Sequence, residues 1–479
     1  MSELLTVLVG YLAIITLVTL WSRTRTKTGD PVDYFIASRG LTGFISAMTY
    51  AATTYSAFMM VGLVGLSYAT GVGALVFELA YLISTVAILS TVGIRVWEMS
   101  RKQGYVTPTQ LLREKYGSYW TTVFVVIMTA VALVPYSAVQ VVGPATILSV
   151  ISRGAIDYQT AVTISAAIVL LTTLTAGLRS VAWTDAVQGV VMLSSAVAFT
   201  AWLFSRVPPE STASLGNLGL LSPLNSFWTP QVLIAYTTPW IFFAITNPQV
   251  FQRLYLPKDR RAYTKMVLYF SIFGLLYTVI TVSVGLVARA LNEAGILTLQ
   301  IDVRSRADWN RVTPLLLTYA HPILSAITAI SIISAATSTV NSIALTISSM
   351  VSYDTPVPDR LKLAVGKAVV VAFTVVVYVF ALTTPAFVVD LAVASSTILL
   401  PLLPIYLFSI YGYARKLPYI ATAAICLPLS LYLTLAKGVV TLIPKEAIIV
   451  LASFCTYLVA LLASKLVEKT RVAPKRASL

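Results

Sequence analysis

The sequence predicts an all-α polytopic membrane protein with about thirteen transmembrane helices. Of its 479 residues, 58% are hydrophobic and only 11% are charged, whereas soluble domains carry about 25% charged residues. The charges are also unevenly spread, because residues 4–21, 119–152 and 312–353 contain none. Runs of this kind reach the roughly 20 apolar residues that a helix needs to cross a bilayer. The composition therefore excludes soluble enzymes, secreted disulfide scaffolds and disordered chains, and it indicates a multi-pass protein of the cell (plasma) membrane.

Thirteen apolar segments follow one another along the chain, and each is predicted to span the membrane. The first starts Met1-Ser2-Glu3 and lacks a small-residue cleavage site, so we interpret it as a retained helix rather than a signal peptide. The segments are residues 4–21, 41–67, 72–95, 119–150, 158–177, 181–206, 230–254, 263–289, 313–352, 360–383, 385–411, 417–436 and 444–466.

The distribution of Lys and Arg orients these segments. With the N-terminus outside and the C-terminus inside, basic residues are about three times as frequent in the cytoplasmic segments as in the external ones. The same bias explains the net charge of +15, so we expect a lipid bilayer and no nucleic acid as partner. Cys426 and Cys455 lie in apolar runs without a paired His, which argues against a disulfide framework or a metal cluster. Nothing in the residues indicates an oligomeric state.

Two segments contain residues that interrupt a helix. Segment 41–67 carries a run of small and polar residues at 49–56, and segment 230–254 carries Asn247-Pro248, where proline removes a helix hydrogen bond. These are the second and the seventh spans. Broken helices at corresponding positions of two halves are typical of inverted-repeat secondary transporters. We therefore predict a broken-helix hinge at Asn247 and Pro248.

A third segment, 119–150, contains Pro135 and Gly143-Pro144, and we expect it to be interrupted as well. The sequence has no nucleotide-binding P-loop, which argues against an ATP-driven pump. It also shows no catalytic pair or metal cluster, so an enzyme is the least expected class. Ion gradients or simple diffusion remain as the energy source.

Segment 313–352 is rich in hydroxyl groups. Ala335, Ser338, Thr339 and Ser342 fall at i, i+3, i+4 and i+7, on one face of a helix. Oxygen ligands on one face, opposite an unwound segment that offers carbonyls, suit a small hard cation. The alternative is that these hydroxyls bond their own backbone or link helices.

Two carboxylates lie inside predicted spans, where a charge is costly and indicates a functional site. Asp185 lies about one turn inside its span, although the helix dipole would also favour an acid there. Glu78 lies in the middle of segment 72–95, where the alternative is a protonated or hydrogen-bonded helix contact. The lone His321 stands at an external boundary with no metal cluster around it.

Four stretches of the chain, within roughly residues 30–415, resemble the sodium/solute symporter family, which includes bacterial sodium/proline and sodium/galactose transporters. In chain order they match an N-terminal loop signature, an internal motif, a broken-helix segment and an ion-binding helix. They are Asp33-Tyr34-Phe35-Ile36-Ala37-Ser38-Arg39-Gly40-Leu41, then Ala176-Gly177-Leu178 with Trp183-Thr184-Asp185-x-x-Gln188, then Asn247-Pro248-Gln249-Val250-Phe251-Gln252-Arg253, and Ser334 to Ser342.

The resemblance implies a five-plus-five inverted-repeat core on spans two to eleven, with broken first and sixth core helices. The corresponding division is residues 1–40 for an extra N-terminal helix and a cytoplasmic loop, 41–206 for the first repeat and 207–411 for the second. Residues 412–479 would hold two C-terminal helices and a basic tail.

The resemblance also implies binding sites. The family's principal sodium site would take the carbonyls of Ala52, Tyr55 and Ala335 and the hydroxyls of Ser338 and Thr339. A second site, for sodium or a proton, would use Asp185, Ser338, Asn341 and Ser342, although Asn341 stands where the family has a serine. The implied solute-binding residues are Thr54, Ser56, Met59, Glu78, Trp240, Phe242 and Phe243.

The sequence therefore predicts a secondary active transporter that moves sodium together with a small organic solute by alternating access. Half-helix ends beside a partly apolar pocket favour an amino acid such as proline, or a monocarboxylate. The alternatives are a proton-coupled symporter with Asp185 or Glu78 as carrier, a transporter-like membrane sensor, and a facilitator or channel.

Overall fold

Helices make up the secondary structure that the computed structural model describes, which covers residues 2–24, 30–175, 177–208, 213–383, 386–436 and 443–472. The all-helical prediction is confirmed for these residues. The longer helices of the first half are α1 (Ser2–Arg23), α3 (Gly43–Thr54), α4 (Val64–Thr70), α5 (Gly73–Ile88), α6 (Ile94–Gln103), α8 (Tyr119–Ile151), α9 (Tyr158–Thr175) and α10 (Leu178–Phe204). Those of the second half are α12 (Pro230–Ile241), α15 (Arg260–Glu293), α18 (Pro322–Asp354), α19 (Lys362–Thr383), α20 (Val388–Leu399), α21 (Leu402–Ile410), α22 (Lys416–Leu435) and α23 (Lys445–Val472).

Short helices connect or continue these elements. They are α2 (Pro31–Ile36), α7 (Pro108–Tyr116), α11 (Ala213–Asn217), α13 (Phe243–Thr246), α14 (Pro248–Arg253), α16 (Arg306–Trp309) and α17 (Val312–Tyr319). Turns of 3-10 helix lie at Ala37–Arg39 and Asp359–Leu361, and π-helical turns at Phe58–Leu63 and Leu89–Gly93.

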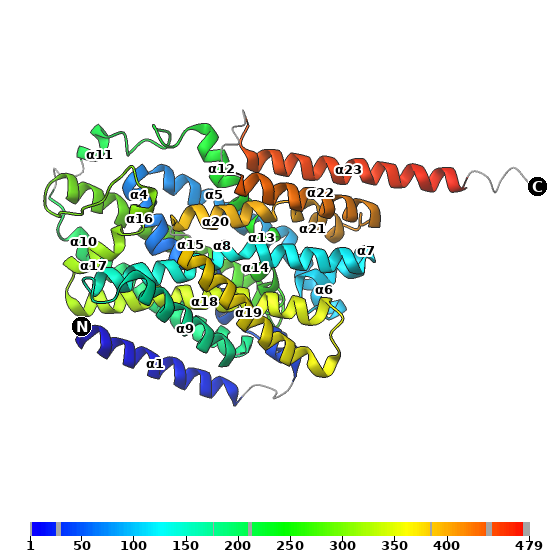
Figure 1. The fold of residues 1–479 in the computed structure, drawn as a ribbon, viewed down its shortest axis with the longest axis horizontal. Coiled ribbons are helices and arrows are strands. Elements are labelled where there is room, and N and C mark those ends of the chain that lie inside the picture. Colours follow the sequence, from blue (N-terminus) through cyan, green and yellow to red (C-terminus); the bar gives the residue numbers. More distant parts are fainter. Residues whose placement is uncertain are drawn as a thin grey trace, which may run out of the picture.

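Eight of the described helices are long and apolar enough to cross a membrane, and the number rises to ten if two bent pairs each count as one span. The chain is therefore a multi-pass membrane protein, whereas the expected total of thirteen spans and the orientation of the termini stay predictions. Figure 1 shows the helices as one bundle, with α1 along one side and α22 and α23 along the opposite side.

The predicted interruption of segment 41–67 is confirmed. The first bent pair consists of α3 and the Phe58–Thr70 run that ends in α4, and its two parts meet at 49°. Helix α3 ends at Thr54, and Tyr55 has φ −88° and ψ 86°, outside the helical region. The predicted interruption at Asn247-Pro248 is confirmed as well. Asn247 is extended, with φ −95° and ψ 110°, and Pro248 begins α14, because a residue before proline is driven out of the helical region.

Two expectations about helix continuity were wrong. Segment 119–150 is not interrupted, since α8 runs unbroken through Pro135 and Pro144. Each proline removes one backbone hydrogen bond, and helices packed on all sides tolerate that loss in membranes. Segment 313–352 is two helices rather than one, because His321 is extended with φ −57° and ψ 137° and Pro322 begins α18.

A further break was not foreseen. Helices α20 and α21 form the second bent pair, at 53°, and Pro401 lies between them.

Helix α18 lies at the centre of the bundle, and 78% of the residues in its most apolar stretch are buried. It packs against α8, α10, α3, α19, α1 and α14. The hydroxyl-rich face predicted from the sequence is therefore enclosed by protein and turned towards the broken helices.

Candidate functional site

The break after α3 places the backbone carbonyl of Ala52 against α18. A carbonyl near the end of a helix loses its intrahelical partner. The Ala52 carbonyl instead accepts a hydrogen bond of 2.8 Å from the Thr339 hydroxyl, which also lies 3.1 Å from the Ala335 carbonyl. Three of the five predicted sodium ligands thus converge on one point between α3 and α18. Tyr55 follows directly at the end of α3.

The fourth residue of this face, Ser338, bonds a buried carboxylate. Its hydroxyl donates to Asp185 Oδ1 at 2.5 Å, and Thr49 of α3 donates to Asp185 Oδ2 at 2.5 Å. Asp185, on α10, has no exposed surface. The predicted pairing of Asp185 with Ser338 is therefore present in the structure, and it joins α3, α10 and α18.

A guanidinium group that the sequence analysis assigned no role bonds the same two helices, α3 and α18, one turn farther along each. Arg253, the last residue of α14, donates from Nη2 to Ser342 at 2.5 Å and from Nε to Thr53 at 3.2 Å. The Thr53 and Ser342 hydroxyls are 2.9 Å apart. Arg253 has no exposed surface, which is unusual for an arginine within the membrane-spanning region.

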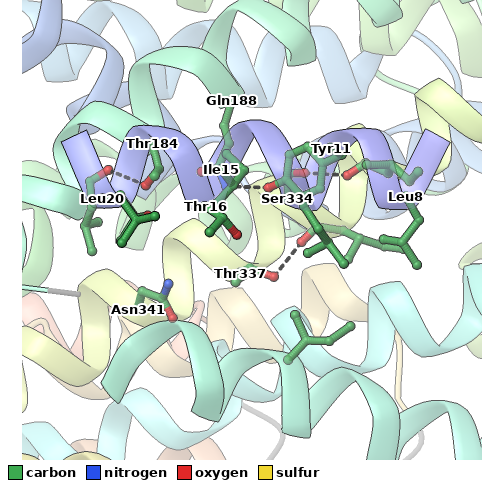
Figure 2. A pocket seen from close by; sticks show the side chains of 16 residues that line it. Leu8, Tyr11, Ile15, Thr16, Leu20, Thr184, Gln188, Ser334, Thr337 and Asn341 are labelled. Carbon is green, nitrogen blue, oxygen red and sulfur yellow. Dashed lines mark hydrogen bonds between the residues drawn. The ribbon is translucent and has the colours of Figure 1, made fainter. Parts of the chain in front are cut away.

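Asn341 takes a different position from the one expected. Its Oδ1 accepts a hydrogen bond from Thr173 of α9, and its side chain lines a cavity of about 580 Å³ bounded by α1, α10 and α18. Figure 2 shows Asn341 and Thr337 on this side of α18, beneath the residues of α1. Gln188 enters the same cavity from α10 and donates to the Tyr11 hydroxyl at 2.7 Å. The structure thus separates Asn341 from the carboxylate-bearing face of α18.

An aromatic pocket lies on the other side of the break in the first bent pair. Glu78 of α5 is 1% exposed, and its Oε2 has no hydrogen-bond partner among the described residues. The residual space is about 10 Å³, roughly one water molecule, so a solute enters only after side chains move. The lining consists of Thr54, Tyr55, Phe58, Glu78, Tyr81, Tyr136, Trp240 and Phe243.

Some of the expected solute-binding residues line this pocket and others do not. Thr54, Glu78, Trp240 and Phe243 belong to the lining. Ser56 instead accepts hydrogen bonds from the Gln140 amide at 3.1 Å and from the Phe58 N–H at 3.2 Å. Met59 and Phe242 lie outside the lining.

Sequence reasoning missed three aromatic residues of the lining, Phe58, Tyr81 and Tyr136. Tyr81 could have been predicted from the sequence, because it follows Glu78 by three residues and so lies on the same helix face. Tyr136 could not have been predicted, because only the folded chain brings α8 to the break after α3. There the Tyr136 hydroxyl donates to the Thr54 carbonyl at 3.3 Å.

The donor set between α3 and α18 fits sodium as a transported ion. Carbonyl and hydroxyl oxygens are the ligands that hard cations prefer. The Thr339 hydroxyl donates to the Ala52 carbonyl, and rotation of that hydroxyl would turn an oxygen lone pair to a cation. Among the described residues no three His, Cys, Asp or Glu side chains are grouped as a transition metal would need.

Comparison with known proteins identifies the family and the fold. The family model described as "Sodium:solute symporter family" matches residues 34–415. The sodium/pantothenate symporter of Escherichia coli (strain K12) is 26% identical over 242 residues, which are 47% of this chain and 50% of that protein. Sodium/glucose cotransporter 1 of Ovis aries is 28% identical over 203 residues, 42% of this chain and 30% of the cotransporter. The chain thus spans about half, or less, of the curated relatives it matches.

A solved structure extends the likeness over nearly the whole fold. A Na+-coupled sialic acid symporter in a substrate-bound, outward-open state superposes with a TM-score of 0.78 at 17% identity, covering 96% of each chain. At this identity the likeness establishes the fold alone.

Proposed function

Because the chain belongs to the sodium:solute symporter family, we propose that it moves sodium and a small organic solute together across the membrane by alternating access. The observation that carries the proposal is the contact between the Thr339 hydroxyl and the Ala52 carbonyl across the break after α3. A cation bound there would tie a broken helix to the central helix α18. Coupling then requires only that sodium and solute favour the same conformation.

The broken helices suit this motion. The breaks after Thr54 and at Asn247 fall in spans predicted to correspond in two inverted repeats, which we place at residues 41–206 and 207–411. Transporters of this architecture bind substrate and ion where such helices unwind and rock one bundle against the other. The other expected parts are an N-terminal helix with its loop at 1–40 and two C-terminal helices with a basic tail at 412–479.

We further propose that the solute is an amino acid, with proline as one candidate. The free Oε2 of Glu78 lies in an aromatic pocket, and a buried carboxylate oxygen requires a donor. An ammonium group meets both features, because it pairs with the carboxylate and is attracted to aromatic faces. A simple monocarboxylate in its ionised form carries no hydrogen-bond donor for this oxygen, so it is the less favoured of the two expected solutes.

Transport into proteoliposomes tests the proposal. Uptake of amino acids, monocarboxylates and sugars would be measured with an inward sodium gradient and with potassium in its place. We expect uptake of an amino acid only with the sodium gradient, and its loss in Ser338→Ala/Thr339→Ala. Thr383→Ala, a change of an exposed threonine at the end of α19, is the matched control and should transport normally. Uptake that follows a proton gradient without sodium would contradict sodium coupling and favour the proton-coupled alternative.

A further inference from the structure

Two buried charges are stacked between the same pair of helices. Thr49 and Ser338 hold the Asp185 carboxylate, and Thr53 and Ser342 hold the Arg253 guanidinium. On each helix the second residue follows the first by four positions, which corresponds to about 6 Å along the axis. The carboxylate and the guanidinium therefore occupy consecutive turns of one polar seam between α3 and α18.

Arg253 has a weak set of partners for a buried charge. Its hydrogen bonds go to two neutral hydroxyls, and its Nη1 has no partner among the described residues. Within that part of the chain no carboxylate forms a direct ion pair with it, but it attracts Asp185 electrostatically through the seam. A buried charge of this kind is costly unless an opposite charge compensates it, and Asp185 is the carboxylate placed to do so.

We propose that Arg253 is the built-in cation of this seam and takes the place of a second sodium ion. The proposal rests on the proposed symport function and adds its stoichiometry: one sodium ion is bound per chain.

The contacts of Ser342 support this assignment. Its hydroxyl oxygen already faces the guanidinium at 2.5 Å and the Thr53 hydroxyl at 2.9 Å. A sodium ion at this oxygen would have to displace Arg253 or lie beside another positive charge. Asn341, the remaining oxygen expected for a second site, is bonded to Thr173 on another face of α18. The contact between Ala52 and Thr339 at the first site involves neither Arg253 nor Asn341.

Saturation binding of radioactive sodium to the purified protein tests the stoichiometry. We expect about one sodium per chain in the wild type, because the positive charge of Arg253 already compensates the negative charge of Asp185. Arg253→Met, of similar length but uncharged, should bind about two with a Hill coefficient that rises above one, because Thr53, Ser342 and Asp185 become available. Arg253→Lys keeps the charge and should still bind about one.

The outcomes separate this inference from the function on which it rests. A wild type that binds no sodium contradicts the proposed symport. Two sodium ions in the wild type, or only one in folded Arg253→Met, overturns the role of Arg253 and leaves sodium symport intact.

A stability cycle covers the case in which Arg253→Met does not fold. Asp185→Asn and Arg253→Met each leave one buried charge without its counterpart, whereas the double variant removes both. We expect the double variant to unfold at a higher temperature than Arg253→Met alone and to retain one sodium site. A double variant no more stable than Arg253→Met would show that the two charges do not compensate each other and would overturn the proposal.

Discussion

In the proposed mechanism, the Thr339 hydroxyl would both stabilise the broken helix and bind the transported ion. Its hydrogen bond to Ala52 satisfies a carbonyl that the end of α3 leaves without a helical partner. The same oxygen lies against Ala335, so a cation arriving between the helices meets ligands that are already in place. Pre-placed ligands reduce the entropic cost of binding.

Glu78 should determine solute affinity without affecting the ion site. We expect Glu78→Gln to fold and bind sodium normally but to bind an amino acid about tenfold to a hundredfold more weakly, since a charge-assisted hydrogen bond contributes about 1.5–3 kcal/mol. Solute binding to purified protein in saturating sodium measures this. Glu98→Gln, the same change at an exposed position of α6, is the control. Unchanged solute affinity in Glu78→Gln would exclude Glu78 from the solute site.

At the scale of elements, helices α4 and α15 approach each other closely where Gly285 has no side chain. A Cβ at Gly285 would lie 1.9 Å from the Ser67 hydroxyl and 2.3 Å from the Val64 carbonyl. Backbone atoms of the neighbouring helix cannot turn aside as a side chain can. The position of α4, the second part of the first bent pair, therefore depends on this glycine.

Gly285→Ala should separate α4 from α15 and destabilise the protein by about 2 kcal/mol, the usual scale of overpacking. Thermal unfolding in detergent measures the loss. Gly10→Ala on α1 is the control, because a Cβ there meets nothing within 4 Å, and it should leave the unfolding temperature unchanged or slightly higher. If Gly285→Ala unfolds at the wild-type temperature, the close approach of α4 and α15 is not a constraint.

Helix breaks could be predicted from the sequence only where a local signal coincided with the folded environment. The polar run at 49–56 and Asn247-Pro248 marked true breaks. Pro135 and Pro144 carried a similar signal, yet α8 remains continuous because the surrounding helices hold it. His321-Pro322 was visible in the sequence and does end a helix; the apolar run continuing on both sides of it hid the break.

At the scale of the whole molecule, a polar cluster joins three segments that are far apart in the sequence, and Tyr236 in this cluster lies one helical turn before Trp240 of the aromatic pocket. Tyr236 of α12 donates to Asp390 of α20 at 2.6 Å. Arg306, the first residue of α16, lies 3.1 Å from Asp390 and donates to the Tyr236 hydroxyl at 3.1 Å. Burial acts to lower the pKa of Arg306, but Tyr236 and Asp390 outweigh it and that pKa is raised. The guanidinium therefore stays charged, and the cluster ties three distant segments together.

Arg306→Gln should loosen this cluster, and we expect it to speed solute release from the adjacent aromatic pocket. The Arg306–Asp390 ion pair is partly exposed, so its loss should lower the free-energy barrier to solute release by about 0.5–1 kcal/mol. The release rate should then rise about twofold to fivefold. Dilution of a preloaded radioactive solute complex measures the rate. Arg304→Gln, at an exposed position two residues before α16, should release solute at the wild-type rate. Equal rates in wild type and Arg306→Gln would mean that the cluster does not restrict the pocket.

The predictability of the site differs between its parts for a physical reason. The α18 face of Ala335, Ser338 and Thr339 follows helical periodicity, so spacing alone could indicate it. Arg253 lay inside a quoted motif, but its place beside Ser342 depends on how α14 docks onto α18. The positions of Asn341 and Tyr136 likewise depend on tertiary packing, which sequence spacing does not encode.

The central claim is that sodium binds between the break after α3 and the hydroxyl face of α18, and saturation binding of radioactive sodium tests it most directly. Purified wild-type protein should bind sodium saturably, and Ser338→Ala/Thr339→Ala should lose that binding while unfolding cooperatively. Thr383→Ala should bind as the wild type does. Sodium binding that persists in the double variant, or that is absent from folded wild type, would contradict the claim.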